Sequence, residues 1–344
     1  MAKSDDRKSQ GLREHTEERQ DKFTDLPDEI LEIIAGKIPL DREDLTLEDV
    51  KNFSKFSRTN KTTYGLFKTE ADKLALRVTK LLEHIVHGKQ DEAEELIKKY
   101  PKLLTFRGDI TDYSGRTFKN ITPFEYTLWA LDRHMWDMML AALPDNETGQ
   151  DIKLSLLQQY KTHREGRGVH YILNGQSRQE RHYDFSLIDK LKKYVENCNH
   201  FRWFPGEQEA YWREEVHGAQ MMLPVHVVNE YCYPTRSFSP RPSFNEKKLP
   251  RLIEIRTIPS KGDPIPWYSL NGAPIFRSGI VRSWLGGSIQ FEELPNPGLC
   301  KADLVALTAL REVRYADVNK LGLRLEIAST PDPASHKIPI GCLG

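Results

Sequence analysis

Two histidines one helical turn apart are the first residues whose spacing could support chemistry. His84 and His87 are three positions apart, so on a helix both imidazoles would lie on one face, where they could bind a zinc ion. A zinc site needs further protein ligands, and no third ligand follows at a usual distance. We therefore interpret the pair as part of a helix and its turn, and the sequence predicts no metal site.

Two short stretches place a thiol near an imidazole. They are Cys198 with His200, and His226 with Cys232. Such side chains could act as nucleophile and base, but catalytic pairs usually meet through the fold rather than along the chain. No P-loop, G-x-S-x-G, H-E-x-x-H or kinase signature is present in the sequence. The sequence therefore predicts no catalytic residue and no cofactor.

Aromatic residues gather in a short stretch after position 200. Aromatic side chains are enriched in the hot spots of protein interfaces, and they also fill ordinary cores. Four of these residues are candidates for binding a target protein: Phe201, Trp203, Tyr211 and Trp212.

The charge balance and the distribution of apolar residues exclude two classes of partner. The 344 residues include 50 Lys and Arg and 50 Asp and Glu, so the formal net charge is zero. Proteins that bind nucleic acid usually carry a surplus of positive charge, so no nucleic-acid partner is expected. No run of eighteen apolar residues exists, so no membrane span is expected.

Four cysteines without C-x-x-C spacing are typical of reduced thiols, which favours the cytoplasm.

The elements that must position these residues are mostly helical. Leu74 to Lys99 has the apolar spacing of two helices separated by a polar turn at 87–89. Thr122 to Glu125 matches a capping box with proline at the first helical position, and a second hairpin would turn at 132–134. Two such hairpins suggest a short helical repeat.

Helical spacing continues in the C-terminal half, and an irregular stretch interrupts it. The helices are expected at 151–161, 185–197, 207–232 with a break at Pro224, and 301–321. Prolines are dense over 233–297, where the β-like runs are 251–258, 275–284 and 287–292, and so many prolines argue against a regular sheet interior. The sequence predicts a mainly α fold with a mixed, partly irregular C-terminal region.

Residues 23–67 resemble the F-box. The run LPDEIL at 26–31, followed by two isoleucines, matches the Leu-Pro, acidic and aliphatic opening of that family. The run LEDVKNF at 47–53 stands where the second helix should lie, and Tyr64 stands at the basic and aromatic end. The link between the first two helices, 39–45, is longer than in the family.

In the F-box family this domain docks onto the Skp1 adaptor and thereby onto a cullin-RING ubiquitin ligase. The resemblance therefore implies Skp1 as a partner, and the alternative is a three-helix element that packs on its own chain. Carried over residue by residue, the docking face would consist of Leu26, Pro27, Ile30, Leu31, Ile34, Leu47, Val50 and Tyr64.

The next segment resembles ankyrin repeats. The runs at 81–89 and 93–97 look like the helix pair of one repeat. The runs at 112–117 and 122–125 look like the hairpin and the Thr-Pro-Leu-His start of the next, with Phe124 and Glu125 in place of Leu and His. Two units do not usually share a sufficient core, so the C-terminal helices are expected to cap the array.

An F-box followed by degenerate ankyrin units is similar to effectors that intracellular bacteria inject into host cells through type IV secretion. The run VHVVNEYC at 225–232 is similar to the C-terminal regions of that group. The resemblance implies a location in the host cell cytoplasm. The tail 329–344 has a single acidic residue, whereas translocation signals of the group are often acidic.

The leading hypothesis is a non-enzymatic adaptor that recruits a Skp1–cullin ligase and holds an unknown target protein. One alternative is an enzyme acting through the C-terminal region, with Cys232 and His226 as candidates. Another is a plain ankyrin-type binding module. The expected organisation is a disordered arm at 1–22, an F-box-like domain at 23–70, ankyrin-like repeats at 71–145, an α-rich target-binding region at 146–328 and a flexible tail at 329–344.

Overall fold

The computed structural model describes residues 61–200, 203–204, 206–255, 265–270 and 294–328. The chain divides into two units, Met1–Leu74 and Ala75–Gly344. Of the first unit only the start of helix α3 (Lys61–Val86) is described, and every other described element belongs to the second unit. The predicted arm 1–22, most of the F-box-like segment and the tail 329–344 lie outside the described residues.

The second unit begins with a helical pair and a β-hairpin. Helix α3 ends at Val86, a turn at 87–89 follows, and α4 (Gln90–Lys99) runs on into the 3-10 helix η1 (Pro101–Thr105). This confirms the predicted helices and their break. Strands β1 (Gly108–Thr111) and β2 (Thr117–Ile121) then form an antiparallel hairpin, with its turn at the predicted position.

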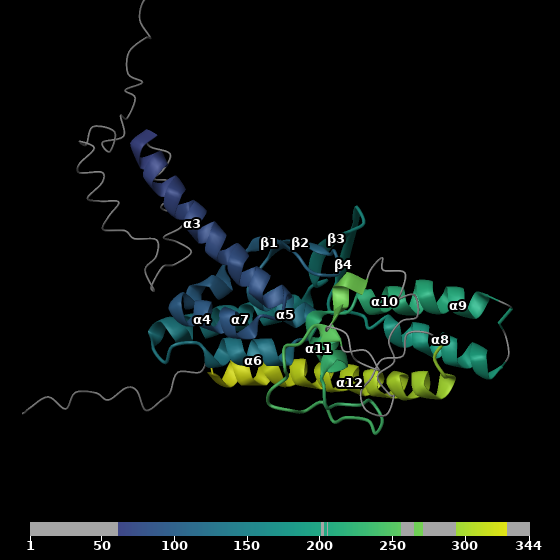
Figure 1. The fold of residues 1–344 in the computed structure, drawn as a ribbon. Helices are drawn as coiled ribbons and strands as arrows, with labels where there is room; N and C mark the ends of the chain where they lie inside the picture. The colour runs from purple at the N-terminus through teal and green to yellow at the C-terminus, as the bar shows by residue number, and fades with distance from the viewer. Residues whose placement is uncertain (1–60, 201–202, 205, 256–264, 271–293, 329–344) are drawn as a thin grey trace, which may run out of the picture. The chain divides into compact units, whose positions relative to one another are not determined.

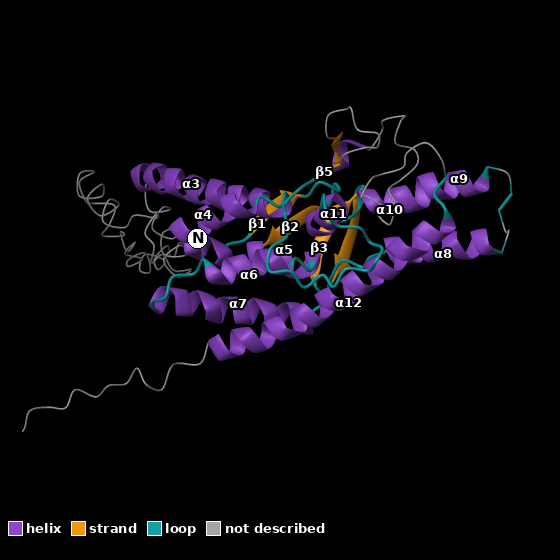
Figure 2. Ribbon diagram, turned by 60° about the horizontal axis from the view of Figure 1, so that its bottom comes forward, coloured by secondary structure: helices purple, strands orange, loops and turns teal. Residues whose placement is uncertain are grey.

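The hairpin belongs to a four-stranded antiparallel sheet in the order β1-β2-β3-β4. Strands β3 (Val169–Leu173) and β4 (Gln176–Glu180) pair across the turn at Asn174 and Gly175, both of which have positive φ. The sequence did not predict this sheet, because β4 is polar along its whole length and lacks the alternation that marks a strand with one buried face. Phe118 of β2 is fully buried against Trp129, which ties the sheet to helix α5 (Pro123–Ala130; Figure 2).

Local caps explain where the next two helices begin. The Thr122 side chain accepts a hydrogen bond from the Glu125 backbone N–H (3.1 Å), and the Thr122 N–H donates to the Glu125 carboxylate (3.2 Å), so the predicted capping box is confirmed. Asp132 caps α6 (Arg133–Ala141) by accepting from the Met135 N–H (3.1 Å).

Further helices follow in the described part of the unit. They are α7 (Glu147–Glu165), α8 (Leu187–Asn199), α9 (Glu207–Tyr211) continuing through a π-helical turn (Trp212–Val216) into α10 (His217–Met221), α11 (Val225–Cys232) and α12 (Pro297–Ala328). Helix α12 packs along α8 (Figure 1) and along α7 (Figure 2), and the break before α11 falls at the predicted Pro224. Helices α7 and α12 are both longer than predicted.

The proline-rich stretch has little regular structure where it is described. Strands β5 (Glu254–Ile255) and β6 (Ile265–Pro266) form a two-residue antiparallel pair, followed by the 3-10 helix η3 (Trp267–Leu270). The β-like runs at 275–284 and 287–292 lie outside the described residues. The fold is therefore mainly α with a small sheet. None of the helices that the structure describes has the length and apolarity to cross a membrane.

Candidate functional site

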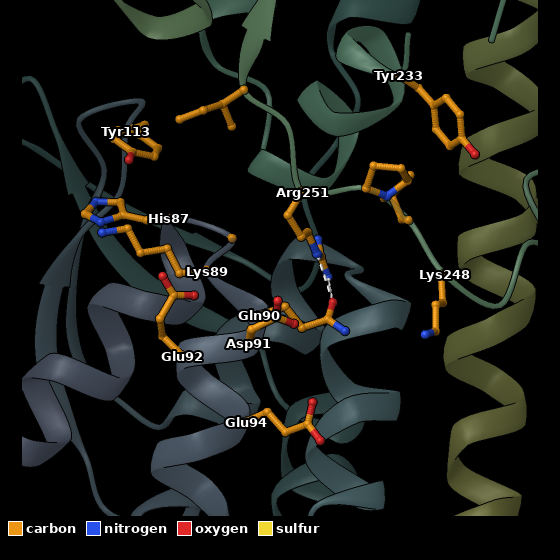
Figure 3. Close-up of a pocket in the computed structure, with 14 residues that line it drawn as sticks. His87, Lys89, Gln90, Asp91, Glu92, Glu94, Tyr113, Tyr233, Lys248 and Arg251 are labelled. Atoms are coloured by element: carbon orange, nitrogen blue, oxygen red, sulfur yellow. Dashed lines mark hydrogen bonds between the residues drawn. The ribbon is translucent and has the colours of Figure 1, made fainter. Parts of the chain in front are cut away.

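A cleft of about 750 Å³ lies in the second unit. Its walls come from the α3–α4 turn, the first residues of α4, the β1–β2 turn and the segment after α11. Figure 3 shows His87, Tyr113, Lys89 and Glu92 on one side and Lys248 on the other, with Arg251 between them. This volume is typical of sites that hold a small molecule or a few residues of a peptide.

One wall of the cleft is a non-helical segment, residues 244–253, which we call the strap. Its backbone carbonyls are held by side chains from three helices. Arg314 of α12 donates to the Phe244 carbonyl (3.1 Å), and Asn229 of α11 donates to the Leu252 carbonyl (2.8 Å). His134 of α6 pairs through Nε2 with the Glu246 carbonyl (2.9 Å). The strap is therefore fixed chiefly by side chains that reach it from elsewhere in the fold.

Arg251 is the main anchor of the strap. Its Nε and Nη2 donate to Gln90 Oε1 (2.9 and 2.8 Å). Its Nη1 and Nη2 donate to the two carboxylate oxygens of Asp132 (2.9 and 3.0 Å), and Nη1 also donates to Asn229 Oδ1 (3.2 Å). A guanidinium has five N–H donors, so all of them are used within the protein. Arg251 consequently joins α4, the start of α6 and α11, and it has no donor left for an anionic ligand.

The charge of Asp132 depends on this contact. Burial alone would raise the pKa of the Asp132 carboxyl, but the Arg251 guanidinium holds that pKa well below its usual range. Asp132 is buried and remains ionised while the bidentate pair is intact. The pair therefore has an electrostatic role in addition to the helix cap.

A glycine allows the α3–α4 turn to approach α11. Gly88 has a φ of +70°, and a Cβ at this position would lie 2.4 Å from Val225 Cγ1. Any other residue would be strained by its backbone conformation and would also overlap Val225. The turn that carries His87 and Lys89 into the cleft is thus built around this glycine.

A stack of three rings begins at the rim of the cleft. The His87 ring lies 4.1 Å from the Tyr113 ring, and the Tyr113 ring lies 4.7 Å from that of Tyr268, with interplanar angles of 29° and 21°. The Tyr268 hydroxyl donates to the Leu223 carbonyl (2.8 Å), which fixes the inner end of the stack. Burial, together with Lys89, lowers the pKa of His87, which favours the neutral form of its ring.

The other charged side chains of the cleft include both acidic and basic residues. Asp91, Glu92 and Lys89 are exposed, as is Lys248, while Glu94 forms an i,i+4 ion pair with Lys98 (2.6 Å). Because both signs are present and Arg251 is saturated, the cleft is suited to a polar, mixed-charge ligand such as a protein segment. Its described residues do not form a cradle for one strong anion.

Behind the strap, α11 carries the thiol and the imidazole that the sequence singled out. His226 and Cys232 are both buried, and neither ring nitrogen of His226 has a hydrogen-bond partner. Six residues along a helix correspond to a rotation of about 240°, so the two side chains point in different directions from α11. This arrangement does not favour the pair as a base and a nucleophile.

The other chemical candidates lie apart from one another. His84 is on α3, His87 belongs to the ring stack, and Cys198 accepts a hydrogen bond from Gln208 (3.3 Å). His200 is exposed at the end of α8, where its Nδ1 pairs with the Glu196 carbonyl. Among the residues that the structure describes, no group of three His, Cys, Asp or Glu side chains could hold a metal ion.

The aromatic candidates for target binding divide into buried and half-buried residues. Trp212 is fully buried against Tyr194 (4.7 Å between ring centroids), so this prediction is corrected: Trp212 fills the core between α8 and the helix that follows. Trp203 and Tyr211 pack on each other (5.2 Å) and stay half-buried. Phe201 lies outside the described residues.

Most of the predicted Skp1 face lies outside the described residues. Seven of its residues lie outside the described part of the chain: Leu26, Pro27, Ile30, Leu31, Ile34, Leu47 and Val50. Tyr64 belongs to α3, and its side chain also lies outside what is described.

Sequence reasoning missed the strap and its anchor. Arg251 stands in a proline-rich stretch with no periodicity, and Gln90 and Asp132 have obvious local roles at the starts of helices. The sequence marks Asp132 only as part of a turn at 132–134, and nothing there points to Arg251.

Comparison with known proteins gives one family. The model of the CBUA0006 C-terminal domain matches residues 186–325. The chain is 40% identical over 276 residues to the uncharacterized protein CBUA0006 of Coxiella burnetii (strain RSA 493 / Nine Mile phase I), a match that spans 74% of this chain and 76% of that protein. No solved structure matches the chain.

Proposed function

The chain belongs to the family of the Coxiella burnetii protein CBUA0006, and from this premise we propose that it is a non-enzymatic adaptor of a Skp1–cullin–F-box ubiquitin ligase. Its N-terminal segment recruits Skp1, and its second unit holds a target protein for ubiquitination. The observation that carries the proposal is the F-box-like run at 26–31, which lies in a unit, Met1–Leu74, distinct from the one that contains the cleft.

The described residues support the binding half of this proposal. The cleft is large enough for a few residues of a peptide, its charges are mixed, and its central arginine is fully engaged within the protein.

The finer organisation is part of the same proposal. Residues 23–70 act as the F-box-like domain, and the helix pairs α3–α4 and α5–α6 act as the ankyrin-like scaffold at 71–145. The region 146–328 completes the target site. A relative in a bacterium supports the bacterial origin that the effector resemblance implies, and the protein would then act in the host cell cytoplasm after secretion.

Co-purification with Skp1 tests the recruiting half. We expect the full chain to retain Skp1, and the double variant Leu26→Ala, Pro27→Ala to lose it, because aliphatic side chains at the docking face supply most of the buried apolar area. Leu154→Ala, at an exposed leucine of α7, is the matched control and should bind like the wild type. Retention of Skp1 by the double variant at wild-type affinity would contradict the proposal.

A plain binding module is the second candidate, since the cleft alone would support it. Deletion of residues 1–70 distinguishes the two. If Skp1 binding is lost while 71–344 keeps its helical circular dichroism and its cooperative melting, the N-terminal segment is a recruiting arm. If the wild-type chain never binds Skp1, the plain module is favoured.

A further inference from the structure

We propose that His226 is an acid-sensitive latch: its neutral ring lets the strap close on the second unit, and its protonation opens the strap and removes one wall of the cleft. The latch regulates the site that the proposed function assigns to the target. It rests on the proposed function only for the identity of that target, because opening of the strap can be measured without any ligand.

The position of His226 is the first observation. It lies on α11, is 1% exposed, and has no hydrogen-bond partner at Nδ1 or Nε2. A cationic imidazole carries two N–H donors that must be satisfied, and the closed structure provides an acceptor for neither. The closed structure is therefore compatible with the neutral ring and incompatible with the cation.

The second observation is which groups surround it. The titratable and charged residues that act on His226 come from every neighbouring element: Asp132 at the start of α6, His134 of α6, Arg251 of the strap and Arg314 of α12. Two of these carry permanent positive charge, and Asp132 already forms a bidentate pair with Arg251. Arg314 is likewise paired, with Glu230 and Asp317. A proton on His226 would thus add a third positive charge to a group whose carboxylates are already paired.

The third observation is that these same groups hold the strap. Arg251 anchors it, His134 and Arg314 bind its carbonyls at Glu246 and Phe244, and Asn229, one turn along α11, binds the carbonyl of Leu252. Since the anchors surround His226, charge placed on its ring acts directly on the contacts that keep the strap closed. Lys248, Leu249 and Pro250 of the cleft wall move with the strap.

The closed structure disfavours protonation of His226 strongly enough to shift the equilibrium for opening of the strap at mildly acidic pH. Burial, reinforced by Arg314 and Arg251 and opposed by Asp132, lowers the pKa of His226 to about 3. In the open state the ring meets water and recovers its ordinary pKa of about 6.5. Lowering the pH from 8 to 5 then multiplies the equilibrium constant for opening about 30-fold through this one residue.

One neighbour on α11 acts in the opposite direction. Burial raises the pKa of Glu230 to about 6 in spite of its ion pairs with Arg236 and Arg314, so the closed state takes up a proton there more readily than water-exposed glutamate does. The effect of His226 must therefore be measured as a ratio between the wild type and a variant that keeps Glu230.

Amide hydrogen exchange on the full chain at pH 8 and pH 5, corrected for the intrinsic rates, provides that ratio. The test compares the wild type with His226→Met, an apolar side chain of similar size, and with His226→Gln in case the methionine is poorly accommodated. His200→Gln, at an exposed histidine, is the control. Circular dichroism at pH 8 verifies that each variant folds.

In the wild type, protection of amides in 225–232 and 244–253 should fall about 30-fold more between the two pH values than in His226→Met. The His200→Gln control should follow the wild type. Equal changes in the wild type and both His226 variants would overturn the latch. An equal loss of protection in β1–β4 and α7 would also overturn it, because acid would then unfold the whole unit. Skp1 retention at pH 8 is independent of these outcomes, so a failed latch and a failed adaptor can be told apart.

Discussion

Replacement of Arg251 by methionine tests the energetic role of the strap's anchor. The change keeps most of the aliphatic stem and removes the guanidinium, whose five donors bind Gln90, Asp132 and Asn229. Asp132 is buried, so the variant leaves a carboxylate without its counter-charge. Removing one partner of a buried ion pair typically costs about 3–5 kcal/mol, which is a large part of the stability of an ordinary domain.

A second variant separates the cost of the uncompensated charge on Asp132 from the rest of the lost free energy of unfolding. Arg251→Met with Asp132→Asn removes the uncompensated charge, and asparagine still caps α6 because it is as good an N-cap as aspartate. We expect the double variant to recover at least half of the lost free energy of unfolding. Asp132→Asn alone should cost less than Arg251→Met, since it leaves the cation 13% exposed and able to reach water.

The pH dependence of the free energy of unfolding provides an independent test. In the wild type the depressed pKa of Asp132 contributes stability above pH 3.8 that is lost as the pH falls further. In Arg251→Met, burial acts without the guanidinium and raises the pKa of the same carboxyl. Asp132 in the folded variant then binds a proton more readily than in the unfolded chain. The difference in free energy of unfolding between the wild type and Arg251→Met should therefore shrink as the pH is lowered from 7 to 5.

Urea denaturation followed by tryptophan fluorescence at pH 7 and pH 5 measures these differences. A loss below about 1 kcal/mol in Arg251→Met would show that the buried pair contributes no more than a surface ion pair. A double variant as unstable as the single one would show that the uncompensated charge on Asp132 is not the cause.

Two further predictions concern local structure. Gly88→Ala should lower the free energy of unfolding by more than about 1 kcal/mol, from its positive φ and from the overlap with Val225, and adding Val225→Ala should relieve only the overlap, as thermal denaturation of the three variants would show. Thr122→Ala should cost about 1–2 kcal/mol by removing the α5 cap and the 2.6 Å hydrogen bond to Gln159, whereas Thr122→Ser should be nearly neutral in urea denaturation.

Local signals explain why much of the helical structure could be predicted. The capping box at Thr122, the break at 87–89 and Pro224 each act within a few residues, so a single sequence contains the whole reason for them. The sheet could not be predicted in the same way. Strand β4 is entirely polar, and its pairing with β3 depends on a turn and on contacts that bury only β3.

The site itself depends on contacts between distant parts of the chain. Arg251 meets a partner 161 residues away in Gln90 and one 119 residues away in Asp132, and nothing near any of the three marks the others. Trp212 illustrates the same limit. An aromatic residue in a charged helix is typical of a hot spot as well as of a core, and only the packing against Tyr194 decides between them.

The family's C-terminal domain model begins at residue 186, and this boundary crosses the contacts of Arg251. Of the three residues that Arg251 binds, only Asn229 lies within 186–325, while Gln90 and Asp132 precede it. His87 and Tyr113 of the cleft precede it as well. An isolated fragment with these bounds would therefore carry the arginine and half of the cleft without the carboxylate that neutralises it. The family's C-terminal domain and the candidate cleft therefore overlap only in part, and a family member reduced to that domain would have to replace the Asp132 charge or lose this cleft.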